Sequence, residues 1–106
     1  MSASRIDLFK QMLESDPANT AVLFGLAKEY EKAGQDDELI AALNRYLENA
    51  DDEGNAYGML ARAYEKQGQR DEARAAYERG IEVANKHGHP GMAEEYKSLL
   101  ASEYED

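Results

Sequence analysis

The strongest constraint on the fold is a nine-residue segment that the chain contains twice. It reads YEKAGQDDE at residues 30–38 and YEKQGQRDE at residues 64–72, so the copies begin 34 residues apart and share seven of nine residues. With the same offset, residues 20–53 and 54–87 are identical at fourteen positions. A fixed period of this size indicates a solenoid, in which one small structural unit recurs and each copy packs on the next.

Each copy has the pattern of two helices joined by a short turn. In the first copy, apolar residues recur at i, i+3, i+4 and i+7, which is one stripe of an amphipathic helix. Gly34 is predicted to end this helix, because glycine adopts the left-handed conformation without a steric penalty. Asp36 is predicted to cap the helix that follows. The predicted stripes of the first copy are Leu23, Leu26, Ala27 and Tyr30, then Leu39, Ile40, Leu43, Tyr46 and Leu47; those of the second are Tyr57, Leu60, Ala61 and Tyr64, then, after Gly68, Ala73, Ala76, Tyr77, Gly80 and Ile81.

On these residues the chain resembles the tetratricopeptide-repeat family. The family's repeat carries a large residue, a Leu-Gly pair and a Tyr, followed by Ala, an aromatic residue, a small residue and Pro. The second copy matches this pattern with Tyr57, Leu60-Ala61, Tyr64, Ala73, Tyr77 and Gly80, and the first with Leu23, Leu26-Ala27 and Tyr30. The first copy departs from it at Leu39 and Tyr46, and the closing Pro is missing at Asp51 and Asn85. The resemblance implies an all-α fold, a short right-handed superhelix of helical hairpins with about six helices.

The same register accounts for both ends of a single predicted domain, residues 1–106. Ser4 and Asp7 have the spacing of a capping box, and Pro90 suits the first turn of a capping helix. Tyr104, beside the acidic end Glu103–Asp106, is expected to fray. The predicted parts are a truncated first unit at 4–16 with Ile6, Phe9, Met12 and Leu13 buried, repeats at 20–53 and 54–87, and a C-terminal capping helix at 89–104 with Met92, Tyr96, Leu99 and Leu100 on its apolar stripe.

The charge balance excludes several classes of partner. Twelve basic and twenty-two acidic residues give a formal net charge of −10, so we expect repulsion from nucleic acid and from anionic membrane surfaces.

The chain has no Cys, which excludes disulfides and thiolate metal sites. The sequence begins without the apolar core of a signal peptide and has no stretch of about 20 apolar residues. A soluble, cytoplasmic protein is the expectation.

Catalytic motifs are not evident in the sequence. His87 and His89, in KHGHP, could share a metal at i, i+2, but no ligand motif accompanies them, and the glycine and proline indicate an exposed turn. No nucleophile elbow or phosphate-binding glycine loop is present. Paired acids such as Asp36-Asp37 and Asp51-Asp52 occur at predicted helix starts, where capping and the helix dipole account for them. We therefore expect no enzyme activity, no cofactor and no bound metal.

The resemblance implies that the first helix of each hairpin lines a groove that binds a peptide or protein segment. On these helices, the face opposite the buried stripe carries two pairs of basic residues one turn apart. The predicted groove residues are Phe24, Gly25, Lys28 and Lys32 in the first repeat and Asn55, Gly58, Met59, Arg62 and Lys66 in the second. The alternative is an ordinary solvated face with weak surface ion pairs, Lys28 with Glu31 and Lys32 with Glu29.

A non-catalytic module that binds an acidic segment is the predicted function. The carboxylate clamp by which some family members grip acidic chaperone tails uses Lys and Asn at set positions, which here hold Phe24, Lys28 and Met59. Neither Asn is present, so this mode of binding is not supported. The alternative function is self-assembly through the terminal helices, with Phe9, Met12 and Leu13 as the contact. We expect a monomer, with a weak homo-oligomer as the alternative.

Overall fold

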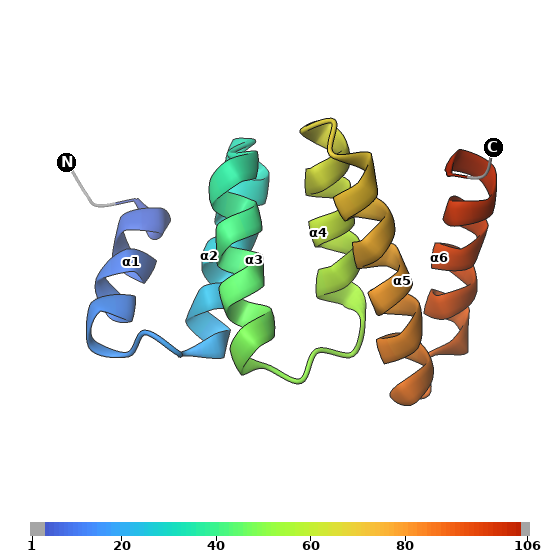
Figure 1. Ribbon diagram of the computed structural model, residues 1–106. Helices are drawn as coiled ribbons and strands as arrows, with labels where there is room; N and C mark the ends of the chain where they lie inside the picture. The colour runs from blue at the N-terminus through green and yellow to red at the C-terminus, as the bar shows by residue number, and fades with distance from the viewer. Residues whose placement is uncertain (1–3, 105–106) are drawn as a thin grey trace. The chain divides into compact units, whose positions relative to one another are not determined.

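The computed structural model describes residues 4–104, and this part of the chain is helical throughout, without a strand (Figure 1). It comprises six helices: α1 (Arg5–Ser15), α2 (Thr20–Ala33), α3 (Asp36–Asn49), α4 (Asn55–Lys66), α5 (Arg70–Lys86) and α6 (Pro90–Glu103). The prediction of an all-α fold of helical hairpins with a last, additional helix is confirmed. The acidic residues 105–106 lie outside the described range.

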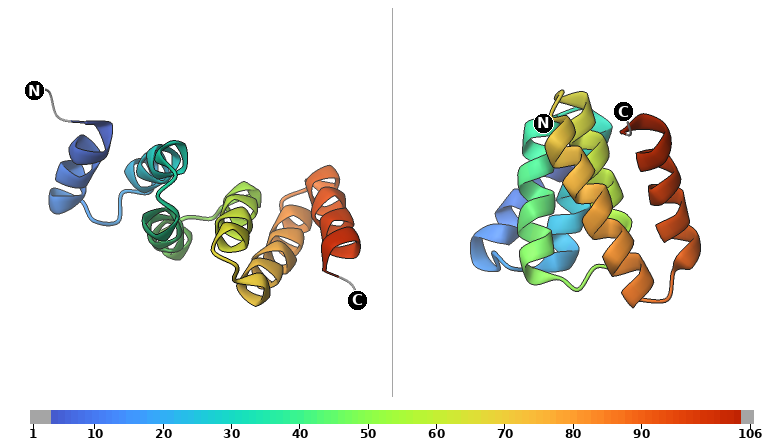
Figure 2. Two further views of the ribbon diagram at one scale, coloured as in Figure 1. Left: turned by 90° about the horizontal axis from the view of Figure 1, so that it is seen from above. Right: turned by 45° about the vertical axis from the view of Figure 1, so that its right-hand side comes forward.

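The helices form two compact units, which divide along the chain between Asp51 and Asp52. In the N-terminal unit, α1 and α3 both pack on α2. In the C-terminal unit, α4 and α6 both pack on α5. Both views in Figure 2 show α5 and α6 side by side, joined by a short connection. Each unit is thus a helical hairpin plus one further helix.

The predicted stripes form the core of both units. Leu23, Leu26, Ala27 and Tyr30 are all buried on α2, as are Leu60 and Ala61 on α4 and Ala73, Ala76 and Tyr77 on α5. The prediction was wrong for Met12 of α1, which is 49% exposed, whereas Leu13 is buried. Helix α1 packs mainly on α2, and Met12 lies outside the buried side of α1 that carries Leu13.

Positive φ angles at glycine end the helices, as predicted. Gly34 has φ +70° and Gly68 has φ +75°, and the residue after each glycine donates its N–H to the carbonyl of Tyr30 or Tyr64, at 3.0 and 2.9 Å. This bond pattern is the Schellman motif. Gly88 ends α5 in the same way, with φ +78° and the His89 N–H donated to the Ala84 carbonyl at 2.8 Å.

The helix starts are capped partly by residues other than those predicted. The Ser4 hydroxyl accepts the Asp7 N–H at 3.1 Å, and the Asp52 carboxylate accepts the N–H groups of Gly54 and Ala56 at 2.8 and 3.0 Å. Asp36 is not a cap: it is the first residue of α3, and Gln35 occupies the capping position. With its carboxylate in the first turn, Asp36 still stabilises the helix through the dipole.

Two tyrosines attach α6 to the rest of the C-terminal unit. The Tyr96 ring lies between α4 and α5, where a Cβ at Gly58 would be 3.0 Å from its Cζ and a Cβ at Gly80 would be 2.9 Å from its Cε2. Its hydroxyl donates to the Gly54 carbonyl at 3.0 Å. These distances leave room for no side chain at either glycine, which explains why the second repeat has glycine there.

Tyr104, at the end of α6, is buried, and the prediction that it frays was wrong. Only 4% of its surface is exposed. Its hydroxyl donates to Glu65 Oε2 at 2.7 Å, and the Arg70 guanidinium lies 4.4 Å from its ring centroid. Its carbonyl accepts a hydrogen bond from Arg74. Tyr96, Leu100 and Tyr104 are spaced by four residues, so Tyr104 extends the apolar stripe of α6.

Replacing Gly68 by Ala should lower the free energy of unfolding by about 1–2 kcal/mol, because Ala resists a positive φ. Gly91 provides the matched control, since it lies in the first turn of α6, where an added Cβ would meet no atom within 4 Å and φ is not positive. Gly91→Ala should be neutral or stabilising by up to about 1 kcal/mol. Urea unfolding of both variants checks this; equal stability of the two would contradict the role of Gly68.

Burial, together with the Glu65 carboxylate, raises the pKa of Tyr77 and of Tyr104 from 10.0 to about 12. Because the folded pKa lies above the unfolded value, this contribution to stability is complete below pH 10 and is lost as the pH rises towards 12. Ultraviolet absorbance of tyrosinate should therefore show a late-titrating fraction. Tyr104→Phe should remove part of that fraction; an unchanged titration curve would contradict the burial of the Tyr104 hydroxyl.

Candidate functional site

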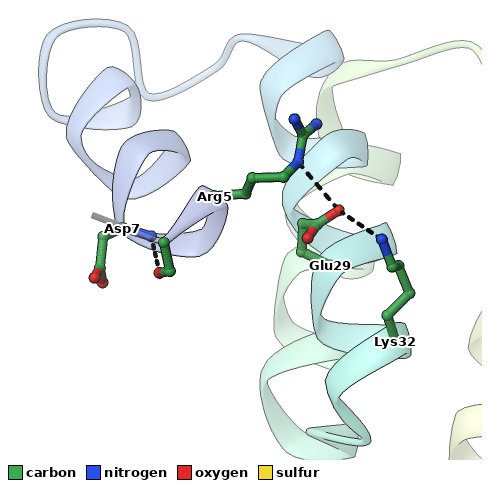
Figure 3. Close-up of polar contacts among 5 residues, drawn as sticks. Arg5, Asp7, Glu29 and Lys32 are labelled. Atoms are coloured by element: carbon green, nitrogen blue, oxygen red, sulfur yellow. Dashed lines mark hydrogen bonds and ion pairs between the residues drawn. The ribbon is translucent and has the colours of Figure 1, made fainter. Parts of the chain in front are cut away.

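Basic side chains from two helices gather on the exposed side of α2. Lys28 and Lys32 are exposed, as predicted, and Arg5 reaches this side from α1 (Figure 3). Arg5 Nε lies 3.4 Å and Lys32 Nζ 3.7 Å from Glu29 Oε2. Two cations therefore share one carboxylate, and Lys28 adds a third positive charge on the same helix. We call Arg5, Phe24, Lys28 and Lys32 the N-terminal basic surface.

An aromatic pair adjoins these cations. The rings of Phe24 on α2 and Tyr46 on α3 have centroids 5.0 Å apart, and Lys28 Nζ lies 5.7 Å from the Phe24 centroid. Both rings are partly exposed. Lys28 is thus held by a cation–π contact, worth about 0.5–1 kcal/mol at an exposed site. The surface combines positive charge with an accessible apolar area.

Gly25, one of the predicted groove residues, is covered by a side chain from the same unit. A Cβ on Gly25 would lie 3.1 Å from Cζ of Phe9, which comes from α1. The Arg5 guanidinium lies 5.2 Å from the centroid of the same ring. Gly25 therefore serves the packing of α1 on α2, and Phe9 is not free to contact a ligand with its whole ring.

On α4 the predicted residues divide into exposed and buried groups. Arg62, Lys66 and Asn55 are exposed. Gly58 lies beneath the Tyr96 ring, and Met59 is 3% exposed. Burial raises the pKa of Tyr96, and the nearby positive charge of Arg62 acts in the opposite direction. We call Arg62 and Lys66 the C-terminal basic surface.

Each hairpin also carries on its surface a cavity that is open to solvent, of about 220 Å³ in the N-terminal unit and 260 Å³ in the C-terminal unit. Residues 34 apart line the two: Leu23, Leu26, Tyr30, Glu38, Ala41, Ala42 and Arg45 in one, and Tyr57, Leu60, Tyr64, Glu72, Ala75, Ala76 and Arg79 in the other. Lys10 and Leu13 of α1 complete the first cavity. The cavities do not include the basic surfaces.

Outside the basic surfaces, the two histidines lie near the connection between α5 and α6. His89 Nε2 contacts a Glu53 carboxylate oxygen, so this imidazole joins the segment before α4 to the start of α6. Within residues 4–104, no three His, Asp or Glu side chains are gathered as a metal site requires. In the same range, no helix has the length and apolar character needed to cross a bilayer.

Sequence reasoning missed Arg5 and Tyr46 as members of this region. Arg5 on α1 contacts Glu29 on α2, and no local sequence pattern predicts a contact between two helices. Tyr46 had a signal, because it stands where the family prefers a small residue. A large aromatic side chain at that position must find a partner, and Phe24 is that partner.

Comparisons with known proteins agree with this architecture. Two sequence profiles described as tetratricopeptide repeat match residues 6–60 and residues 54–87. Among solved structures, a crystal structure of MamA is 19% identical, with a TM-score of 0.52 over 92% of this chain and 85% of that chain; it supports the fold. The curated proteins yielded no match.

Repeats of this family serve as scaffolds for protein–protein interaction. The first profile spans more than half of the chain, and the second coincides with the repeat at 54–87. The helical hairpins, their period and the turn glycines follow the same pattern. The chain belongs to the tetratricopeptide-repeat family.

Proposed function

We propose that this chain docks acidic peptide or protein segments, without catalysis, on the exposed side of α2 and on the exposed side of α4, each surface acting by itself. One observation carries the proposal: both repeats hold exposed cations at equivalent positions of their first helix, in a chain of net charge −10. Lys28 corresponds to Arg62 and Lys32 to Lys66, each 34 residues later. An acidic chain gains no solubility from such a concentration of positive charge.

The spacing of the cations selects the form of the ligand. Residues four apart on a helix are separated by about 6 Å along its axis. In an extended peptide, alternate side chains on one side are about 7 Å apart. A segment with acidic residues at alternate positions therefore fits a pair such as Lys28 and Lys32. Phe24 and Tyr46 offer an apolar contact beside it.

Binding to such a surface should be weak. The net charge of −10 opposes the approach of an acidic ligand, and the cations act only within a Debye length of about 8 Å at physiological salt. Glu29 already takes part of the charge of Arg5 and Lys32. We expect dissociation constants on the order of 10 μM or weaker, strengthening as the salt concentration falls.

The peptide Glu-Ser-Glu-Ser-Glu should shift the backbone amide resonances of residues 24–32 and 55–66, whereas Gln-Ser-Gln-Ser-Gln should not. Arg62→Glu/Lys66→Glu should abolish the shifts on α4, because it replaces the attractive charges by repulsive ones. Lys10→Glu/Lys86→Glu is the matched control, since it makes the same change in net charge at two other exposed lysines. Circular dichroism verifies that both variants keep their helices.

Two outcomes would contradict the proposal. The first is the absence of shifts on α2 and α4 with the acidic peptide at low salt. The second is an equal loss of binding in the two charge-reversed variants, because binding would then depend on overall charge and not on these side chains.

Self-assembly through α1 is the second candidate function, and one observation favours it. Leu8 and Met12 are 48% and 49% exposed, and they lie one turn apart on the same side of α1. They are the large hydrophobic side chains that the structure leaves exposed within residues 4–104. The predicted contact changes accordingly: Leu13 is buried, and Phe9 packs on Gly25.

Sedimentation velocity over a range of concentrations separates the two candidates. If peptide docking is the function, the sedimentation coefficient should stay that of a monomer, because two exposed side chains bury too little area for a stable dimer. A concentration-dependent increase that Leu8→Ser/Met12→Ser removes, and that Ala18→Ser at another exposed position does not, would establish self-assembly instead.

A further inference from the structure

Helix α6 is attached to the C-terminal unit with few fully buried residues. Of its fourteen residues, only Ala93 and Tyr96 are buried, whereas α5 buries six of seventeen. Elements with few buried apolar contacts are the first to open in native proteins. The attachment of α6 therefore depends on the two tyrosines, Tyr96 near its middle and Tyr104 at its end.

Tyr104 occupies a defined socket at the turn between α4 and α5. Glu65 accepts hydrogen bonds from two phenols, Tyr104 at 2.7 Å and Tyr77 at 3.3 Å. Arg70 donates to the Glu103 carbonyl at 2.6 Å and also lies over the Tyr104 ring. Arg74 donates to the Tyr104 carbonyl. We call Glu65, Arg70, Arg74 and Tyr77 the tyrosine socket.

The socket recognises three chemical features at once. Its carboxylate accepts a hydrogen bond from the phenol. Its guanidinium groups lie over the aromatic ring and donate hydrogen bonds to two successive backbone carbonyls. The Tyr77 ring completes it, with its centroid 6.1 Å from that of Tyr104 and the two rings nearly perpendicular. Phenylalanine satisfies the ring contacts but leaves the Glu65 carboxylate without its shorter bond.

Docked α6 also brings negative charge to α4. It carries Glu94, Glu95 and Glu103 against the single cation Lys97. Its Tyr96 ring lies on Gly58, one turn before Arg62, and the charges of Arg62 and Glu95 both act on the Tyr96 hydroxyl. An acidic ligand that approaches Arg62 therefore meets the Glu95 carboxylate of α6 nearby.

We propose that the tyrosine socket is a binding site for the chain's own Tyr104, and that it holds α6 as a releasable strap whose opening strengthens the binding of an acidic segment to α4. The first half concerns the C-terminal unit alone. The second half rests on the proposed function, because it requires that Arg62 and Lys66 bind such a segment. Release removes both the cover over Gly58 and the net negative charge of α6.

Native-state hydrogen exchange tests the socket without any ligand. Tyr104→Phe should raise the hydrogen-exchange rates of the α6 amides about tenfold, because the hydrogen bond to a charged acceptor is lost. Tyr104→Ala should raise these rates about a hundredfold, because the ring contacts are lost as well. Amides in the middle of α5 should be unaffected. Tyr64→Phe is the control, since Tyr64 lines the cavity of this unit and is not part of the socket. Wild-type exchange of α6 in both Tyr104 variants would overturn the proposal.

Titration with Glu-Ser-Glu-Ser-Glu tests the second half. Tyr104→Ala should bind this peptide at least about threefold more tightly than the wild type, and adding Arg62→Glu/Lys66→Glu to it should remove the binding. If α6 opens but the affinity is unchanged, the strap does not regulate α4. If neither protein binds the peptide, the proposed function and the regulatory half fail together, while the exchange data decide separately whether the socket holds α6.

Discussion

A tyrosine ring fitted between two glycines holds the C-terminal unit together. Tyr96 can lie against both α4 and α5 only because Gly58 and Gly80 have no side chains. The corresponding positions in the first repeat are Phe24 and Tyr46, and there the two rings pack against each other in a tilted arrangement. The same two positions of the repeat are thus filled differently in the two units. In the C-terminal unit a ring from α6 lies against two glycines, and in the N-terminal unit two aromatic side chains contact each other. The exposed aromatic pair and the attachment of α6 both follow from this difference.

The net charge of the chain and the charge on its predicted binding surfaces have opposite signs. The chain is strongly acidic, yet the first helix of each repeat exposes cations at the same two positions. Arg5, Lys32 and Glu29 form exposed ion pairs that add little stability, about 0–1 kcal/mol each. Their arrangement is better understood as a means of orienting side chains. Glu29 holds two cations near one another and leaves the surface with an excess of positive charge.

Much of the fold was predictable from the sequence because the repeat depends on local sequence patterns. The period, the stripes and the glycine turns depend on residues within a few positions of one another, and Gly34 and Gly68 have the predicted conformation. Predictions that depend on contacts between helices were less reliable. Met12 is exposed although the apolar spacing of α1 predicts its burial, and Arg5 reaches α2 through a contact that no spacing reveals. For Tyr104 the stripe continued at the right interval, but the charged partners that bury it lie about thirty residues or more away along the chain.

The two hairpins carry cavities with closely similar linings, so that one cavity can serve as a reference for the other. Among the seven pairs of equivalent lining residues, six are identical and only Leu23 and Tyr57 differ. The first cavity has in addition a wall formed by Lys10 and Leu13. A small apolar probe molecule on the protein surface would therefore meet nearly the same chemical environment twice in one molecule. Any difference in its residence times would report the effect of that wall and of one side chain, free from differences in temperature, solvent or preparation.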